Sequence, residues 1–137
     1  MEALFSLPDP ARAEALSSLA LAHVGDAFFE LLVRTRLASE REATAEKLHR
    51  ETVRIVNAGA QAEFARLLLP ELTEGETAVY KRGRNAHVNS VPRHASLGDY
   101  HAATGFEALF GWLWLRGETA RLRELFDRIW SSLNSDL

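Results

Sequence analysis

The chain has 137 residues, is 47% hydrophobic and 26% charged, and carries a net charge of −3 from 16 Lys and Arg against 19 Asp and Glu. This length fits one domain over residues 1–137, and the absence of cysteine excludes disulfide scaffolds, zinc ribbons and thiol nucleophiles. The sequence has neither an apolar run of the roughly 20 residues that cross a bilayer nor a signal peptide, so we expect a cytoplasmic protein without a membrane partner.

The spacing of apolar residues predicts an all-α fold, because they recur every three to four positions and nowhere alternate as in a strand. The first two predicted helices cover residues 18–38 and 44–56. A third helix runs from the Asn57-Ala58-Gly59 cap or kink to about residue 69, and a fourth begins after residue 73 and includes residues 79–84. The last two predicted helices cover residues 99–114 and 118–133.

Start and stop signals bound these helices. Asp9 before Pro10 is a predicted N-cap, and Thr73 followed by Glu76 has the spacing of a capping box. Gly117 is expected to end the helix over residues 99–114. The segment 87–97 is irregular and is predicted to form a long loop.

Two carboxylates fall within apolar helical sequence. Asp26 lies in the helix over residues 18–38, and Glu107 lies in the one over 99–114. A charge pressed against apolar surface is costly unless it is paired or binds a metal. Oxygen ligands without Cys or a helical His pair favour Mg²⁺, with Mn²⁺ as a substitute, over zinc. Because bound Mg²⁺ activates water and neutralises phosphate charge, the pair predicts phosphodiester hydrolysis.

Three glycines beside these acids predict that their helices cross closely. Gly25, Gly105 and Gly111 each cost helix stability relative to alanine, by about 1 kcal/mol. Small residues allow two helix backbones to approach, and such a crossing would bring Asp26 and Glu107 together. We therefore expect the two carboxylates to share one site.

A structural interpretation of the acids also stays open at this point. The two carboxylates could pair with Arg34, Arg36 or His23 in an ion-pair network. Glu30, one turn beyond Asp26, is either a third acidic ligand or a solvated neighbour at i,i+4 spacing, and the latter is favoured.

A basic segment supplies a second signal. Residues 77–98 contain no Asp or Glu but hold four basic residues: Lys81, Arg82, Arg84 and Arg93. Positive charge and amide donors around Gly83, with Asn85 next to them, suit contacts with phosphate and sugar. Charged segments are also often plain solvated surface, and the lack of acids is what favours phosphate binding here.

Four segments resemble the ribonuclease III family. Residues 19–27 resemble the signature helix of its catalytic domain, and residues 104–111 resemble its second acidic helix. Residues 81–86 and the segment 48–62 are similar to the Mini-ribonuclease III branch in particular. The resemblance spans roughly residues 19–115, with its motifs in the family order.

The resemblance implies an Mg²⁺-dependent endoribonuclease with an all-α catalytic domain that forms a homodimer. It implies that Asp26 and Glu107 hold metal and act in catalysis, with one pair per protomer cutting opposite strands of double-stranded RNA to 5′-phosphate and 3′-hydroxyl ends. The implied substrate is the 23S ribosomal RNA precursor, which leaves room for a ribosomal protein as an accessory partner. The residues expected to bind RNA are Lys81, Arg82, Arg84 and Asn85, and more weakly His49, Arg50 and Arg54.

Aromatic residues around the acidic helices provide apolar material for the implied dimer interface, although some of them are expected to be core: Phe28, Phe29, Phe106, Phe110, Trp112 and Trp114.

The sequence departs from full-length ribonuclease III at two positions. The family has acids where this chain has Ala22, four residues before Asp26, and Thr104, three residues before Glu107. Both gaps resemble the Mini branch, and they predict weaker metal binding that RNA phosphates complete. Because the sequence ends at Leu137 without a double-stranded-RNA-binding domain, we expect the catalytic domain itself to supply affinity.

Two other functions fit parts of the sequence. An all-α nucleotide pyrophosphohydrolase would use Asp26 and Glu30 at i,i+4 spacing and would not need the basic segment. A non-catalytic RNA-binding or ribosome-associated module would keep the fold without turnover, as the missing acids allow.

Overall fold

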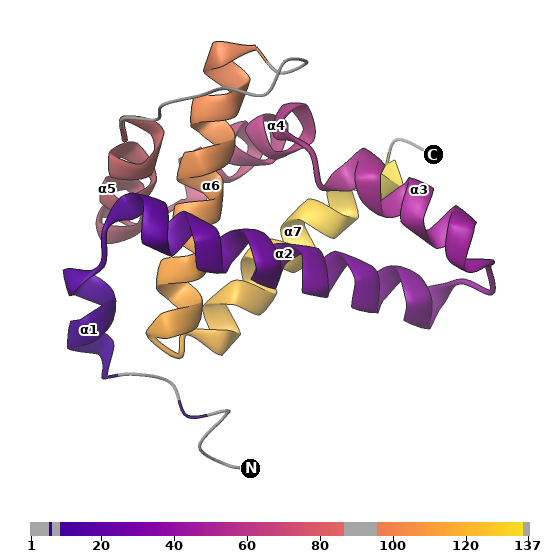
Figure 1. Ribbon diagram of the computed structural model, residues 1–137, viewed down its shortest axis with the longest axis horizontal. Helices are drawn as coiled ribbons and strands as arrows, with labels where there is room; N and C mark the ends of the chain where they lie inside the picture. The colour runs from indigo at the N-terminus through magenta and orange to yellow at the C-terminus, as the bar shows by residue number, and fades with distance from the viewer. Residues whose placement is uncertain (1–5, 7–8, 87–95, 136–137) are drawn as a thin grey trace.

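A computed structural model describes residues 6, 9–86 and 96–135. Over these residues the chain is helical and contains no strand, which confirms the predicted all-α class. The elements are α1 (Pro10–Ala15), α2 (Ser18–Glu40), α3 (Ala45–Ile55), α4 (Ala58–Leu68), the 3₁₀ turn η2 (Leu69–Glu71), α5 (Glu74–Arg84), α6 (Leu97–Leu115) and α7 (Thr119–Ser135), shown in Figure 1. Among the described helices, none is long and apolar enough to span a bilayer. The predicted loop lies outside these residues except at its end, where Leu97 begins α6.

Side-chain caps begin the helices where the sequence predicts them. Asp9 accepts a hydrogen bond from the backbone N–H of Ala11, at 2.8 Å, and so caps α1. The capping box of α5 is complete, because Thr73 Oγ1 accepts from Glu76 N at 3.1 Å and Glu76 Oε1 accepts from Thr73 N at 2.9 Å. Gly117 follows the end of α6 with a φ of 73°, a conformation that favours glycine.

Helix α6 forms the centre of the molecule, and α2, α4, α5 and α7 pack around it (Figure 1). Phe29 of α2 makes edge-to-face contacts with Phe106 and Phe110 of α6, at centroid distances of 5.0 and 5.5 Å. These three rings are buried and belong to the core rather than to an interface. By contrast Phe28 and Trp114 stack on one another at 4.7 Å in a half-buried position.

The backbones of α2 and α6 touch where they cross. A methyl group on Gly25 would lie 1.7 Å from the carbonyl oxygen of Glu107, and one on Gly111 would lie 2.0 Å from that of Leu21. Only glycine fits at these two positions, which confirms the predicted close crossing. The expectation for Gly105 is wrong, since a methyl group there would instead meet the carbonyl oxygen of Tyr80 on α5, at 2.6 Å.

Candidate active site

The α2–α6 crossing brings Asp26 and Glu107 to one place. Gly25 precedes Asp26 and lies directly against the backbone of Glu107, so the two acids approach from different helices. Asp26 is exposed and Glu107 is half-buried. When Glu107 is protonated it donates a hydrogen bond to Asp26. The predicted pair of carboxylates is therefore present, open to solvent on the Asp26 side.

The electrostatics of this pair favour a positive charge. Burial is the largest cause, and together with the hydrogen bond to Asp26 and the negative charge of Asp26 it raises the pKa of Glu107 from 4.5 to about 9. Without a cation, one proton therefore stays on Glu107 at neutral pH. A divalent cation between the carboxylates would replace that proton and remove the repulsion.

The structural alternative for the acids is not supported. Arg34 pairs with Glu30 at 3.2 Å, and Arg36 pairs with Asp127 at 3.0 Å. Within the described residues, no ion pair joins Asp26 or Glu107 to a basic side chain. The ion pair with Arg34 is what a solvated neighbour at i,i+4 spacing would make, so it favours that interpretation of Glu30 over a third ligand and weakens the pyrophosphohydrolase interpretation.

The donor set fits a magnesium-like ion held in part by substrate. In the part of the chain that the structure describes, no group of three or more His, Cys, Asp or Glu side chains converges. Two carboxylate oxygen donors without a counter-cation match Mg²⁺, which keeps several waters and often takes only one or two carboxylates with substrate phosphates. Asp26 and Glu107 would hold such an ion.

Comparison with known proteins shows the family. The Ribonuclease III domain matches residues 19–118. The chain belongs to the ribonuclease III family. Relatives named Mini-ribonuclease 3 include those of Symbiobacterium thermophilum, 46% identical over 80% of this chain and 85% of the relative, and of Clostridium tetani, 42% identical over 80% and 74%. The crystal structure of protein FN1578 from Fusobacterium nucleatum is similar with a TM-score of 0.78 and 26% identity, over 88% of this chain and 94% of that one.

This result confirms the Mini-ribonuclease III resemblance, and the protein is an endoribonuclease, a hydrolase that acts on RNA. The two positions where this chain departs from the ribonuclease III acids add no ligand. Ala22 is buried, and the buried Thr104 hydroxyl donates to the backbone carbonyl of Tyr100 at 3.0 Å. The candidate site thus has two acids, Asp26 and Glu107.

The basic residues expected to bind RNA occupy the last turn of α5. Lys81, Arg82 and Arg84 are exposed, and Asn85 caps the helix, accepting a hydrogen bond from Arg84 Nε at 3.4 Å. Gly83 is buried within the helix, where an added methyl group would lie 2.9 Å from the Cα of Gly105 on α6. Gly83 therefore serves helix packing, while the basic side chains around it are exposed to solvent.

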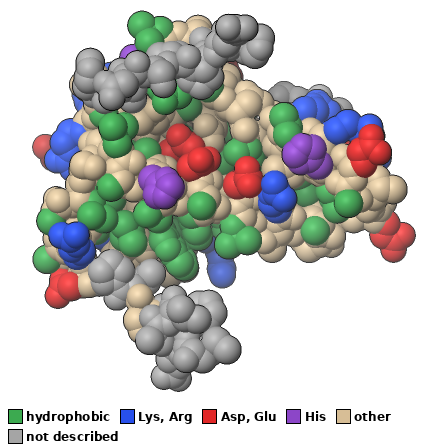
Figure 2. All heavy atoms as spheres, viewed as in Figure 1, with side chains coloured by type: hydrophobic (Ala, Val, Ile, Leu, Met, Phe, Trp, Pro, Cys, Tyr) green, Lys and Arg blue, Asp and Glu red, His purple; other side chains and the backbone are tan. Residues whose placement is uncertain are grey.

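The weaker RNA-binding candidates lie on α3, on the other side of the crossing. His49, Arg50 and Arg54 are exposed, and Arg50 pairs with Glu46 at 3.3 Å. Figure 2 shows acidic side chains near the α2–α6 crossing, with basic side chains over α5 on one side and over α3 on the other. The structure thus does not join the seven residues in one patch but distributes them around the carboxylates.

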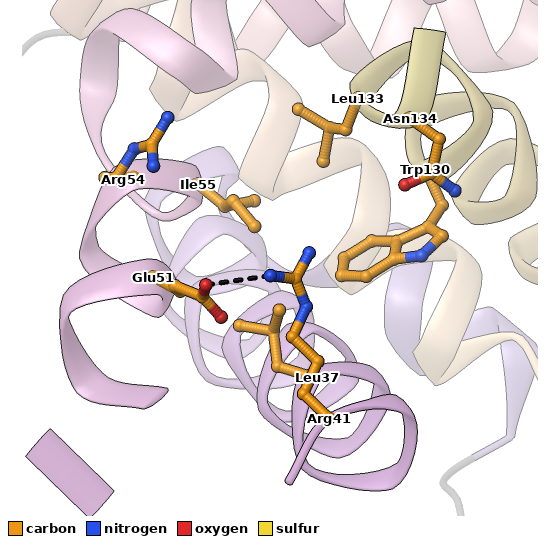
Figure 3. A pocket seen from close by; sticks show the side chains of 8 residues that line it. All are labelled: Leu37, Arg41, Glu51, Arg54, Ile55, Trp130, Leu133 and Asn134. Carbon is orange, nitrogen blue, oxygen red and sulfur yellow. Dashed lines mark hydrogen bonds and ion pairs between the residues drawn. The ribbon is translucent and has the colours of Figure 1, made fainter. Parts of the chain in front are cut away.

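Arg54 also faces a separate hollow between α2, α3 and α7, shown in Figure 3. There Arg41 donates to Glu51 at 2.8 Å, and the floor is apolar, with Leu37 and Trp130 among its residues. This hollow contains neither Asp26 nor Glu107, so it is distinct from the candidate site at the carboxylate pair.

Gln61 on α4 is a polar side chain at the site that we did not predict as functional. It is 3% exposed, and its amide acts on Glu107 by favouring the ionised carboxylate. Its Nε2 nevertheless has no hydrogen-bond partner of ordinary geometry. The available signal was a glutamine at the start of an otherwise apolar stripe, Gln61, Phe64, Ala65 and Leu68.

Proposed function

We propose that this ribonuclease III family member is a homodimeric, Mg²⁺-dependent endoribonuclease that cleaves double-stranded RNA. The observation that carries the proposal is the meeting of Asp26 and Glu107 at the α2–α6 crossing without a basic partner in the described part of the chain. The names of the relatives, Mini-ribonuclease 3, support the same reaction class.

The acidic residues would bind the metal, and the basic residues would contact the phosphates of the RNA. Asp26 and Glu107 would hold Mg²⁺, which would lower the pKa of a water and neutralise charge on the scissile phosphate. Lys81, Arg82 and Arg84 carry positive charge toward the RNA backbone, and Asn85 offers an amide to phosphate or sugar. The products would be 5′-phosphate and 3′-hydroxyl ends. Since A-form RNA is recognised mainly through its shape and backbone, duplex rather than base sequence would decide binding.

An apolar surface supports the homodimer. A shallow hollow beside the catalytic acid is lined by His23, Val24, Ala27, Phe28, Leu31 and Trp114. Leu31 is 61% exposed, which is unusual for a large aliphatic side chain on a helix. Figure 2 shows hydrophobic side chains gathered below the central acidic ones. Because this surface adjoins Asp26, pairing two copies through it would place two sites near one duplex.

The biological substrate that we propose is the 23S ribosomal RNA precursor, cut in the cytoplasm. A ribosomal protein could then act as an accessory partner by presenting the RNA, since the described domain offers only dispersed basic residues. His49, Arg50 and Arg54 on α3 would contact RNA further from the cut. Cleavage of authentic precursor that exceeds cleavage of an unrelated duplex of equal length would support this choice.

The decisive experiment compares a long duplex RNA with a single-stranded control. Each is incubated with Mg²⁺, with chelator, and with the Asp26→Asn protein. We expect metal-dependent cutting of the duplex alone, lost in Asp26→Asn. A matched control is Glu30→Gln, which removes an acid one turn away that is paired with Arg34 and should leave cleavage within about threefold of wild type.

Two outcomes would contradict the proposal. Duplex RNA that is bound but never cut, including authentic precursor, would favour a non-catalytic RNA-binding module. Cutting that survives Asp26→Asn, or that proceeds in chelator, would show that the carboxylate pair does not hold a catalytic metal. A monomer by light scattering at micromolar concentration would contradict the homodimer separately.

A further inference from the structure

Gln61 occupies a position where the packing of α4 calls for an apolar side chain. The buried residues of α4 follow one stripe that packs on α6, and every member except Gln61 is apolar: Ala62, Phe64, Ala65 and Leu68. A buried amide with an unsatisfied N–H destabilises the folded state relative to an apolar side chain of similar shape. The fold alone therefore gives no reason for glutamine at this position.

The surroundings of Gln61 point toward the carboxylate pair. Its side chain is buried within reach of the Glu107 carboxylate, yet Nε2 lacks a hydrogen-bond partner of ordinary geometry. Glu107 is also engaged with Asp26. A buried N–H donor thus lies beside the carboxylate pair without a partner of ordinary geometry.

We propose that Gln61 is a positioning residue for RNA hydrolysis: its Nε2 donates a hydrogen bond to Glu107 when that carboxylate holds metal. The hydrogen bond would fix which oxygen of Glu107 faces the shared site and leave the other oxygen to Gln61. Ala22 and Thr104 supply no acid here, so this neutral donor is the third polar side chain of a two-carboxylate site. The inference rests on the proposed Mg²⁺-dependent cleavage.

The test uses the full-length protein with Gln61→Met, which keeps the size of the side chain and removes the donor. We expect the single-turnover rate constant for duplex cleavage to fall about 10- to 100-fold, as for other partners that orient a metal ligand. The Kd for RNA, measured in chelator, should not change. Mn²⁺ binding to the RNA-free protein, measured by calorimetry, should weaken about tenfold.

Thermal stability separates this role from a merely structural one. In chelator, Gln61→Met should melt at the wild-type temperature or above it, because an unsatisfied amide is removed. The matched control is Thr52→Val, another buried polar side chain, whose hydroxyl donates to the Leu48 carbonyl within α3 at 2.8 Å. It should leave both cleavage and Mn²⁺ binding unchanged.

A measurement on the wild-type protein needs no variant. In the ¹⁵N-labelled protein, the side-chain NH₂ signals of Gln61 should shift on addition of Mg²⁺. Those of Asn57, which already donates to Val53 and Arg54 carbonyls at 2.9 and 3.0 Å, should not shift.

The outcomes distinguish the two proposals. If wild type cleaves duplex RNA and Gln61→Met is equally active, or if the Gln61 NH₂ signals do not shift with Mg²⁺, the positioning role of Gln61 is wrong. The proposed nuclease function would still stand. If Gln61→Met melts at a lower temperature than wild type and its loss of activity equals its loss of folded protein, Gln61 has a structural role only. If wild type does not cleave duplex RNA, the proposed function fails, and unchanged Mn²⁺ binding in Gln61→Met then overturns the positioning role as well.

Discussion

Two glutamates on neighbouring helices have opposite surroundings. Glu76 of α5 is 4% exposed and accepts hydrogen bonds from Arg121 Nε and Nη2, both at 2.9 Å, and from the backbone N–H of Thr73 at 2.9 Å. Glu107 of α6 has another acid and an uncharged amide beside it. Both carboxylates are withdrawn from solvent, and only the first is compensated by a cation of the protein.

The pKa values record this difference. Burial alone would raise the pKa of Glu76, but the hydrogen bonds from Arg121 and from Thr73 outweigh it and lower the pKa. Burial, with the hydrogen bond and charge of Asp26, raises the pKa of Glu107 to about 9. A buried acid that is satisfied within the fold supports structure, whereas one that is left without a counter-charge marks a place for a ligand.

The largest expected effect concerns catalysis. Glu107→Gln should lower the rate constant of duplex cleavage by about 10³-fold, since it removes a charge that would hold the metal at the reacting phosphate. Glu76→Gln, assayed per folded molecule, should cleave at close to the wild-type rate. Equal losses of the cleavage rate constant in the two variants would contradict the proposed difference in function between the two glutamates. Single-turnover kinetics measures both.

The next effect concerns stability. Arg121→Met should lower the free energy of unfolding by about 3 kcal/mol, because it leaves Glu76 buried without its cation. Arg128→Met is the matched control, since its ion pair with Glu71 is exposed and should contribute less than about 1 kcal/mol. Urea denaturation measures both, and a similar small loss in each would contradict the importance of burial.

The two glutamates should also give opposite dependences on pH. The folded pKa of Glu107, about 9, exceeds its ordinary 4.5, so the folded state binds the extra proton between these values. In chelator, the free energy of unfolding of wild type should therefore fall relative to that of Glu107→Gln as pH rises from about 5 to 9. Glu76 has a lowered pKa, so its contribution is present above 4.5 and is lost on acidification below it. Melting temperatures at pH 5 and 9 test this, and a constant difference between the proteins would contradict it.

The smallest effect concerns the contribution of the last turn of α5 to RNA affinity. Lys81→Ala should weaken duplex binding a few-fold and reduce the slope of log Kd against log salt concentration by about 1, as expected for one phosphate contact. Arg12→Ala, an exposed residue on α1, should not change the slope. A slope that is unchanged by Lys81→Ala would remove α5 from the RNA-binding surface.

Local features of the sequence were enough to predict the helices and the two acids. Capping residues such as Thr73 act on their own helix, and the spacing of apolar residues reports which face is buried. Gly25 and Gly111 could be recognised because each lies within a few residues of an acid in an apolar helix. These signals need no knowledge of how distant helices pack.

The features that escaped prediction depend on contacts between distant segments. Gly105 lies nearer to Glu107 in the sequence than Gly111 does, yet it faces α5, and only its contact with Tyr80 reveals that. Gln61 could not be connected with Glu107 from the sequence, because only the packing of α4 against α6 brings the two side chains together.

The contact of main chain on main chain between α2 and α6 has a consequence for folding. Asp26 and Glu107 belong to segments far apart in the sequence, and they meet only when Gly25 seats against the Glu107 carbonyl. The unfolded chain therefore does not hold the two carboxylates together, and the proposed ion binding would be coupled to the docking of these two helices. Mn²⁺ affinity measured at a series of urea concentrations would then report the docking of α2, in the first third of the chain, against α6, in the last third. No Mn²⁺ should bind at urea concentrations at which these two helices are apart.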